Sequence, residues 1–229
     1  MDAIKKQCAK EALQFIQENT IIGLGGGSTI AYLIEFIKSA NLSVKIVTPS
    51  TTTKMLCVSN GLEVLPTSSV EKISVAFDGC DEVDEQLIAL KSGGGIHTKE
   101  KLIANMADDY ILLIDESKFV PSLTGKFPIV LEILEDSLSF VKKRIYEIGG
   151  IPTIRQSTEK DGYTISDNGN LLMDVRLENI DDFTGLQETL TAICGVVETS
   201  LFTKEVTKVL IAKETSFQIL SKNNNGVIA

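Results

Sequence analysis

The chain lacks several features that mark whole classes of protein. Its 229 residues contain no tryptophan, one histidine and four cysteines that form no C-x-x-C pair. Without such a pair or a cluster of histidines, we expect neither a structural zinc site nor a disulfide framework. We interpret Cys8, Cys57, Cys80 and Cys194 as packing residues of a protein in a reducing compartment, and we expect no bound metal.

Long apolar runs and an excess of basic residues are also missing. No stretch approaches the roughly 18 to 20 apolar residues that span a bilayer, and the polar first ten residues do not resemble a signal peptide. We therefore expect a cytoplasmic protein that contacts no membrane. The formal net charge of -9 argues against nucleic acid as a partner, because phosphate-backbone binding needs clustered Lys and Arg. A small anion can still be bound where positive groups are focused locally.

The first half of the chain has alternating helical and strand-like segments. With 43% hydrophobic residues, the chain can bury the core of one large domain, with or without a smaller one. Apolar periodicity predicts helices at 2–18, 28–40, 52–59 and 98–108, and strands at 20–24, 44–47, 62–65, 73–77 and 110–114. This alternation predicts an α/β fold with a doubly wound, mostly parallel sheet covered on both faces.

The second half has a different order of elements. It runs strand, helix, strand, strand, helix, strand, at 127–134, 137–148, 153–156, 171–177, 182–193 and 196–202. That order is the split unit of ferredoxin-like α+β domains. A further strand at 206–212 is expected to return to the first sheet. We therefore predict a Rossmann-like domain at 1–125 and 203–229, with a smaller ferredoxin-like domain inserted at 126–202.

A glycine-rich loop at 23–27 follows the first strand and leads into a helix that Ser28 or Thr29 can cap. The dinucleotide fingerprint G-x-G-x-x-G fails at Ser28, and the loop has no lysine for a Walker A motif. What remains is a turn whose amides and hydroxyls face a helix N-terminus, a place that favours phosphate. A tight turn with no ligand explains the loop equally well.

Carboxylates follow the next buried strand of the predicted sheet. Asp78 and Asp81 come directly after the strand 73–77, at the carboxyl edge where open α/β sheets bind ligands. Glu82 and Glu85, by contrast, are interpreted as solvated charges. An acid/base site for a small anionic substrate is therefore one interpretation of this segment.

A lysine, a glycine run and a further acid complete the segment. Lys91 precedes Ser-Gly-Gly-Gly at 92–95, a run that can bring backbone amides close to a substrate. Thr98 is a candidate N-cap, and it would place Glu100 in the first turn of the following helix. An acid at that position can also simply complement the helix dipole. We interpret His97 as a loop residue near the site with no direct chemical role.

Three motifs in this segment resemble the signature of ribose-5-phosphate isomerase of the A type. They are Asp-Gly-x-Asp-Glu-x-Asp from residue 78, Lys-x-Gly-Gly-Gly from 91, and His-Thr-Lys-Glu-Lys from 97. Further motifs match in order over nearly the whole chain: Gly-Gly-Gly-Ser-Thr at 25–29, Asp-Glu-Ser-Lys at 115–118, Gly-Lys-Phe-Pro at 125–128, Asp-Asn-Gly-Asn at 167–170 and Gly-Val-Val-Glu at 195–198. The resemblance implies the two-domain architecture described above, a homodimer or homotetramer, and no cofactor.

The resemblance also implies an activity and roles for particular residues. The reaction would be the interconversion of D-ribose 5-phosphate and D-ribulose 5-phosphate through an enediolate, in the non-oxidative pentose phosphate pathway. Glu100 would move a proton between C2 and C1, while Asp78, Asp81 and Lys91 handle hydroxyl protons, ring opening and oxyanion charge. The implied substrate contacts are Gly26, Gly27, Ser28, Thr29, Ser92, Gly93, Gly94, Lys118 and Lys5.

One position departs from the family pattern, whose first loop usually reads Gly-Thr-Gly-Ser-Thr. This chain has Gly26 where that threonine is expected. We expect retained activity with binding weaker by about 1 kcal/mol, as for one lost neutral hydrogen bond.

Two other functions stay open at this stage. A non-catalytic sugar-phosphate sensor would keep the glycine loop but would not need Glu100 together with Lys91. An acyl-CoA transferase with a glutamate nucleophile would need a CoA pocket, which the sequence does not reveal.

Overall fold

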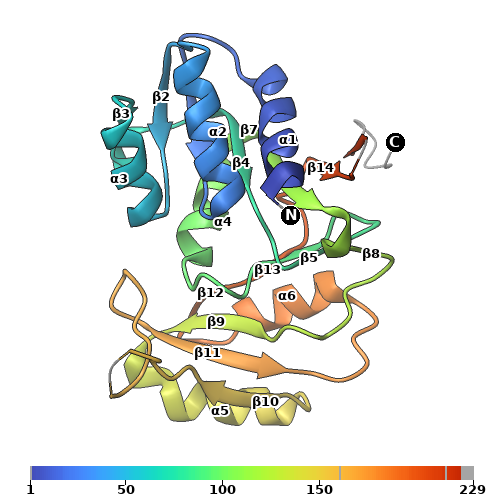
Figure 1. The fold of residues 1–229 in the computed structure, drawn as a ribbon. Coiled ribbons are helices and arrows are strands. Elements are labelled where there is room, and N and C mark those ends of the chain that lie inside the picture. Colours follow the sequence, from blue (N-terminus) through green and yellow to red (C-terminus); the bar gives the residue numbers. More distant parts are fainter. Residues whose placement is uncertain (1, 160, 215, 223–229) are drawn as a thin grey trace.

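A computed structural model describes residues 2–159, 161–214 and 216–222 (Figure 1). The helices are α1 (Asp2–Ala12), α2 (Ser28–Ser39), α3 (Thr51–Ser59), α4 (His97–Met106), α5 (Leu138–Glu147) and α6 (Phe183–Thr191), with single 3-10 turns η1 (Leu13–Phe15), η2 (Thr67–Ser69), η3 (Glu116–Lys118) and η4 (Glu135–Ser137). The strands are β1 (Thr20–Leu24), β2 (Val44–Val47), β3 (Glu63–Val64), β4 (Ile73–Asp78), β5 (Glu82–Asp84), β6 (Ala89–Leu90), β7 (Ala107–Asp115), β8 (Phe119–Val120), β9 (Ile129–Ile133), β10 (Ile151–Ile154), β11 (Leu171–Arg176), β12 (Val196–Thr199), β13 (Leu201–Phe202), β14 (Lys208–Ala212) and β15 (Phe217–Ser221).

A seven-stranded sheet in the order β15-β14-β7-β4-β1-β2-β3 forms the upper part of the molecule in Figure 1. All neighbours pair in parallel except β14 and β15, which are antiparallel. Helices α1 and α2 pack against one face, while Ile103 and Ala104 of α4 join the core on the other. The expected doubly wound, mostly parallel sheet is confirmed. It forms because apolar side chains on both faces of the strands need helices to cover them.

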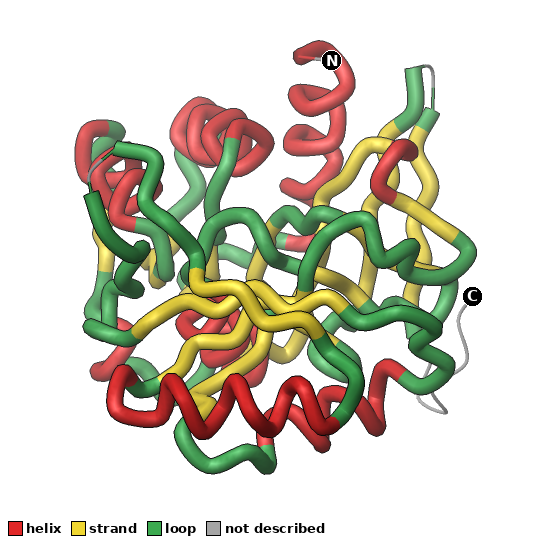
Figure 2. The backbone as a smooth tube through the Cα atoms, turned by 90° about the horizontal axis from the view of Figure 1, so that it is seen from below, coloured by secondary structure: helices red, strands yellow, loops and turns green. Residues whose placement is uncertain are grey.

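A four-stranded antiparallel sheet in the order β10-β11-β9-β12 forms the lower part. With α5 and α6 packed on it, this unit has the strand and helix order of a ferredoxin-like fold. Figure 2, viewed from below, shows its strands with helices running alongside them. The exact domain boundaries at 126 and 202 stay a prediction, and 223–229 of the outer range lie outside the described residues.

A third, small sheet in the order β13-β6-β5-β8 lies between these two and was not predicted. Its strands have only two or three residues, too few to give a periodic pattern. The predicted strand 196–202 is in fact split: β12 pairs with β9 and β13 pairs with β6. The interpretation of Glu82 as solvated was wrong, because it is buried in β5 and its Oε2 accepts from the Thr124 amide at 3.0 Å. Glu85 is exposed, as expected.

The two predicted helix caps were also wrong. Gly27 is the N-cap of α2 and Ile96 that of α4, and neither has a side-chain cap. The Thr98 hydroxyl instead donates to Glu132 on β9. The hydroxyl that local spacing assigned to a helix cap therefore donates to a carboxylate distant in the sequence.

Two further interpretations need correction. His97 is the first residue of α4 and is fully buried rather than in a loop, and burial lowers its pKa to about 4. Cys194 is exposed, whereas Cys8, Cys57 and Cys80 are buried and agree with a packing role.

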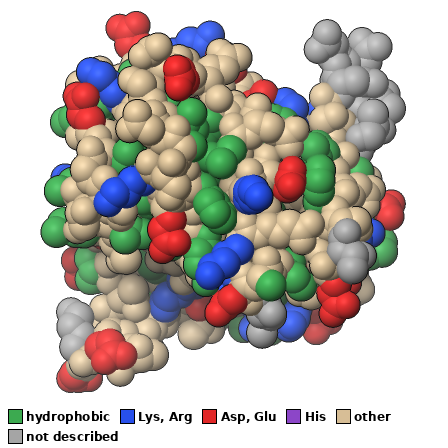
Figure 3. Space-filling model, turned by 45° about the horizontal axis from the view of Figure 1, so that its top comes forward, with side chains coloured by type: hydrophobic (Ala, Val, Ile, Leu, Met, Phe, Trp, Pro, Cys, Tyr) green, Lys and Arg blue, Asp and Glu red, His purple; other side chains and the backbone are tan. Residues whose placement is uncertain are grey.

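Charges of both signs are interspersed on the face of the molecule shown in Figure 3. That face presents no basic stripe of the kind that follows a nucleic-acid backbone. Within the part of the chain that the structure describes, no helix has both the length and the apolar character to cross a membrane. Among the same residues, no three His, Cys, Asp or Glu side chains are grouped closely enough to hold a metal ion.

Candidate active site

A cavity of about 610 Å3 opens at the carboxyl ends of β1, β2 and β4. This is the edge at which open α/β sheets bind ligands. The residues that line it are Gly26, Gly27, Ser50, Thr51, Thr52, Asp78, Gly79, Cys80, Asp81, Lys91, Gly93, Gly94, Ile96, Glu100, Lys118 and Asp167.

Three charged side chains that are nearly fully buried meet at this cavity. The Nζ atom of Lys91 lies 3.1 Å from Asp78 Oδ2 and 3.3 Å from Glu100 Oε1, and it also donates to the carbonyl of Gly79. Asp78 ends β4, Lys91 follows β6 and Glu100 lies in the first turn of α4. The fold therefore brings together three residues that the sequence analysis singled out for proton handling.

This arrangement sets the protonation of Glu100. Burial raises its pKa to about 8; the Lys91 charge opposes this rise and the Asp78 charge adds to it. Burial alone would lower the pKa of Lys91, but Asp78 and Glu100 outweigh it and raise that pKa. Glu100 therefore exchanges its proton near neutral pH while Lys91 stays charged, which suits a general base.

Asp78 is fixed from four sides. Its Oδ2 accepts from Lys91 and from Tyr110 Oη at 3.0 Å, and its Oδ1 accepts from the Gly79 amide at 2.8 Å and the Gly26 amide at 3.4 Å. Tyr110 was not among the predicted site residues, because its position in the middle of β7 marks it only as core. It is almost fully buried and stacks on Phe202.

The first glycine loop packs directly on Asp78. The pairing of β1 with β4 aligns the ends of the two strands, and the Gly25 amide donates to the Phe77 carbonyl at 2.8 Å. A Cβ atom on Gly25 would lie 2.0 Å from Asp78 Oδ1. Glycine is therefore required there for steric reasons, whatever the loop binds.

Asp81 organises the second glycine loop. Its Oδ2 accepts from the amides of Ser92 at 2.5 Å and Gly93 at 3.1 Å. Gly93 and Gly94 line the cavity, but Ser92 does not: its hydroxyl points away and donates to the Pro128 carbonyl at 2.5 Å. Two of the amides expected to face substrate are thus already bound to Asp81.

The remaining predicted contacts divide into two groups. Lys118 lines the cavity, and its Nζ donates to the Cys80 carbonyl at 2.7 Å. Lys5 donates to the Ser28 hydroxyl at 2.9 Å, but neither of these residues is among the lining residues, and nor is Thr29. Substrate contact by Lys5, Ser28 and Thr29 stays a prediction.

Sequence reasoning missed two parts of the lining. Ser50 caps α3, and Thr51 and Thr52 begin it, shortly after the end of β2, so the strand-end argument that found Asp78 could have found them. Asp167 comes from a loop of the antiparallel unit and forms an ion pair with Lys99 at 3.1 Å. No local pattern brings that loop to this edge of the larger sheet.

Comparisons with known proteins agree in the family that they indicate. The family model described as ribose 5-phosphate isomerase A (phosphoriboisomerase A) matches residues 45–216. Ribose-5-phosphate isomerase A of Methanocaldococcus jannaschii is 38% identical over 224 residues, which cover 96% of this chain and 98% of that protein.

Solved structures give the same result. The structure of ribose 5-phosphate isomerase A from Methanocaldococcus jannaschii superposes with a TM-score of 0.90 at 37% identity, covering 96% of this chain and 99% of its own. A D-ribose-5-phosphate isomerase in complex with phospho-erythronic acid superposes with a TM-score of 0.90 at 32% identity, covering 96% of this chain and 98% of its own. The chain therefore belongs to the ribose 5-phosphate isomerase A family.

Proposed function

We propose that this protein interconverts D-ribose 5-phosphate and D-ribulose 5-phosphate, a step of the non-oxidative pentose phosphate pathway. One observation carries the proposal: a glutamate with a pKa of about 8 faces a sugar-sized cavity beside a buried lysine and a second carboxylate. A general base works best when its pKa lies near the working pH, because the group can then both lose and hold a proton, and a pKa of about 8 is close to neutral.

Glu100 is the base. Starting from the aldose, its carboxylate takes the proton from C2, and the C–H electron pair forms the C1–C2 double bond while O1 takes up the carbonyl electrons. The resulting enediolate regains the same proton at C1, while the O2 proton is transferred to O1, so that C2 gains the ketose carbonyl and C1 carries a hydroxyl. Asp78 and Asp81 serve the hydroxyl protons and ring opening.

Lys91 stabilises the enediolate. Its ammonium already lies between Asp78 and Glu100, so the charge that forms on the substrate oxygen meets a fixed cation among nearly fully buried side chains. A preorganised donor of this kind contributes roughly 10² to 10³ in rate. No metal or other cofactor is required by this chemistry.

The substrate phosphate is expected to bind at the N-termini of α2 and α3. Both N-termini reach the lining of the cavity, through Gly26, Gly27, Thr51 and Thr52. Amides at helix N-termini favour anions.

The test is an isomerase assay on the purified protein. Ribose 5-phosphate is supplied in the presence of EDTA and ketose formation is followed. We expect turnover by the wild type and a loss of about 10² to 10⁴ in kcat for Glu100→Gln. Exposed Glu85 provides the matched control, since Glu85→Gln changes an acid on the same segment and should leave kcat unchanged.

A binding measurement separates loss of chemistry from loss of the site. Phospho-erythronic acid, the molecule held by one of the solved relatives, should bind Glu100→Gln with an affinity close to that of the wild type in a calorimetric titration. No ketose from the wild type, or full activity of Glu100→Gln, would overturn the proposal. Binding of the analogue without any turnover would instead indicate a sugar-phosphate sensor.

We also propose a homodimer or homotetramer located in the cytoplasm. Family resemblance supports the oligomer, and the antiparallel unit exposes large apolar side chains at Phe140, Tyr146 and Ile151. Light scattering coupled to size exclusion measures the assembly directly, and a monomer at micromolar concentration would refute it. The two-domain division at 126 and 202 is likewise a proposal, which limited proteolysis tests.

A further inference from the structure

Glu132 on β9 is fully buried, and the proposed mechanism does not use it. Its Oε1 accepts from Ser166 Oγ at 2.8 Å, Asn168 Nδ2 at 3.0 Å and Asn170 Nδ2 at 2.7 Å. Its Oε2 accepts from the Thr98 hydroxyl. Among the described residues, no lysine or arginine forms an ion pair with it. A buried carboxylate held only by neutral donors is unusual enough to require a reason.

The donors keep Glu132 ionised. Burial by itself raises its pKa, but the hydrogen bonds from Thr98, Asn170, Asn168 and Ser166 outweigh burial and lower it. An ionised carboxylate is an acceptor only, with lone pairs on both oxygens for several donors at once. Glu132 can therefore organise two separate segments of chain around a single side chain.

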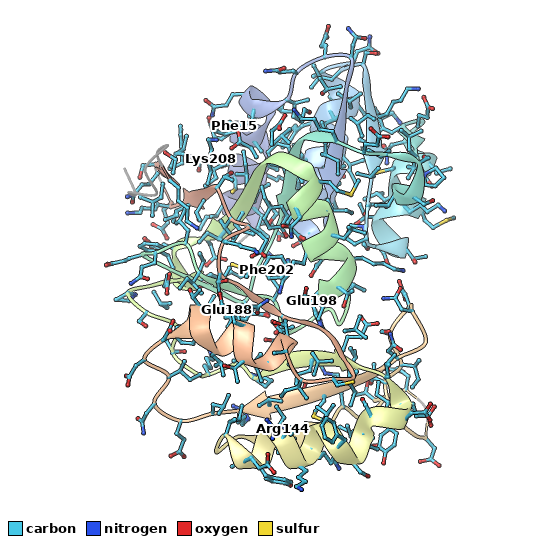
Figure 4. All side chains as sticks on the ribbon, turned by 180° about the vertical axis from the view of Figure 1, so that it is seen from behind. Phe15, Arg144, Glu188, Glu198, Phe202 and Lys208 are labelled. Atoms are coloured by element: carbon cyan, nitrogen blue, oxygen red, sulfur yellow. The ribbon has the colours of Figure 1, made fainter. Side chains whose placement is uncertain are left out.

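Each of these two segments contributes a residue to the lining of the candidate active site, Glu100 from α4 and Asp167 from the loop. Thr98 lies in the first turn of α4, two residues before Glu100. The other three donors belong to the loop 166–170, and Asp167 of this loop lines the cavity and pairs with Lys99. Helix α4 stands over the antiparallel sheet and contacts β12, near Glu198 in Figure 4. Glu132 is thus hydrogen-bonded both to the helix that carries the base and to the loop that carries Asp167.

The placement of Asp167 affects how a sugar phosphate can enter. A carboxylate repels a phosphate dianion, whereas it accepts hydrogen bonds from sugar hydroxyls. With Asp167 on one wall, the phosphate is directed to the helix N-termini of α2 and α3, and the sugar hydroxyls face the loop. The loop must be held in place for this discrimination to work.

We propose that Glu132 is a positioning residue of the isomerase site, which sets the separation of Glu100 and Asp167 by binding Thr98 on one side and the loop 166–170 on the other. The inference rests on the proposed function. Its two sets of hydrogen bonds have different consequences. The bond from Thr98, the α4 arm, orients the base Glu100. The bonds from the loop 166–170, the loop arm, hold the loop that contacts the sugar.

Single-arm variants test this division. Thr98→Val removes only the hydroxyl of the α4 arm, and kcat is expected to fall about tenfold with KM little changed, since small displacements of a base reduce the rate steeply. Thr98→Ser keeps the hydroxyl and should restore kcat. Asn170→Ala cuts the loop arm, and KM for ribose 5-phosphate is expected to rise about tenfold while kcat changes less.

Coupling through Glu132 is tested in a double-mutant cycle. Glu132→Gln keeps the size of the side chain but removes its charge and one acceptor, and it should reduce kcat and raise KM together. In that background Thr98→Val should have little additional effect, because residues that act through one partner are not additive. Full additivity of Thr98→Val and Glu132→Gln would overturn the proposal.

A matched control separates positioning from stability. The Thr124 hydroxyl also donates to a buried carboxylate, Glu82 Oε1 at 2.5 Å, but neither residue lines the cavity. Thr124→Val should lower the free energy of unfolding as Thr98→Val does, yet leave kcat and KM unchanged. All rates are measured well below the melting transition of each variant.

The outcomes distinguish the two proposals. A wild type without isomerase activity refutes the proposed function and with it this role for Glu132. An active wild type whose Thr98→Val and Asn170→Ala variants lose only stability refutes the positioning role alone. Calorimetric binding of phospho-erythronic acid gives a second readout, in which Asn170→Ala should bind more weakly and Thr98→Val should bind like the wild type.

Discussion

Two glutamates of this protein are both buried, yet their surroundings push their protonation in opposite directions. Glu100 lies beside Lys91, and its pKa is nevertheless raised to about 8 because burial and the nearby Asp78 outweigh the lysine. Glu132 forms no ion pair with a lysine or arginine in the part of the chain that the structure describes, and its pKa is lowered because four neutral groups donate to it. The two pKa values therefore differ because burial and Asp78 outweigh the lysine at Glu100, whereas hydrogen bonds outweigh burial at Glu132.

The difference matches the roles that we propose for them. A base must release and regain a proton near the working pH, so Glu100 benefits from a cation that it shares. A residue that holds two segments together must keep one charge state throughout, so Glu132 benefits from neutral donors that do not titrate. The following predictions test this contrast, beginning with the largest expected effect.

Removing the lysine should break the Glu100 side of the comparison. In Lys91→Met the two carboxylates lose their common cation, so the pKa of Glu100 should rise further and kcat/KM should fall by about 10² to 10³. The measurement is kcat/KM as a function of pH, with folding checked by circular dichroism. Lys72→Met, which removes an exposed ion pair with Asp108, is the control and should leave kcat/KM unchanged. An unchanged rate in Lys91→Met would contradict the role of this lysine.

Removing the carboxylate should break the Glu132 side. In Glu132→Leu four donors lose their acceptor in a buried site, and the free energy of unfolding should fall by about 3 kcal/mol. Urea unfolding followed by circular dichroism measures this change. A loss within about 0.5 kcal/mol, as at an ordinary surface position, would mean that the donors find other partners at no cost.

The pH dependence of stability should have opposite signs at the two residues. The pKa of Glu100 is raised in the folded state from 4.5 to about 8, so its contribution to stability is complete below pH 4.5 and is lost as pH rises through 8. For Glu132 the pKa is lowered, so its contribution is present above pH 4.5 and is lost in acid.

Unfolding free energies of the wild type, Glu100→Gln and Glu132→Gln across this range provide the measurement. Relative to Glu100→Gln, the wild type should become less stable as pH rises from 4.5 to 8. Relative to Glu132→Gln, the free energy of unfolding of the wild type should stay constant over this range, and its advantage should shrink only in acid. Isomerase kcat/KM should rise with pH as Glu100 loses its proton. Parallel curves for the two variants would refute the contrast.

The smallest effect concerns the first loop. A Cβ on Gly26 would lie 3.8 Å from the Ser50 side chain, an ordinary contact, so threonine fits there. Gly26→Thr should lower KM by about fivefold, which corresponds to about 1 kcal/mol for one added hydrogen bond. Gly26→Val is the control, because it adds the same bulk without the hydroxyl. A KM that is unchanged or higher in Gly26→Thr would contradict the prediction.

Local pattern was sufficient for the larger sheet and for one residue at the centre of the candidate site. Apolar runs predicted β1 and β2 at their observed bounds, and the carboxyl edge of a parallel sheet brings strand ends together whatever the connections are. This argument places Asp78 at that edge. Lys91 follows β6 of the unpredicted third sheet and Glu100 lies on α4, so their grouping with Asp78 was predicted from the family resemblance.

Contacts between segments distant in sequence could not be obtained in this way. Glu132 and its partners Thr98 and Ser166 are each separated by 34 residues, and Glu132 appears in the sequence as one acid in an apolar strand. The small third sheet escaped prediction because its strands are too short to show alternation. Glu82 and His97 were misjudged because their burial depends on elements that pack over them from elsewhere in the chain.

The strand order of the larger sheet also affects how the protein is made. β7 is an interior strand of the sheet, between β4 and β14, yet β14 is separated from it in sequence by the entire antiparallel unit. A nascent chain on the ribosome therefore exposes one edge of β7, with its apolar side chains, until Lys208–Ala212 has emerged. Unpaired edges of this kind favour aggregation. We expect the chain to depend most on chaperones at this step of its synthesis.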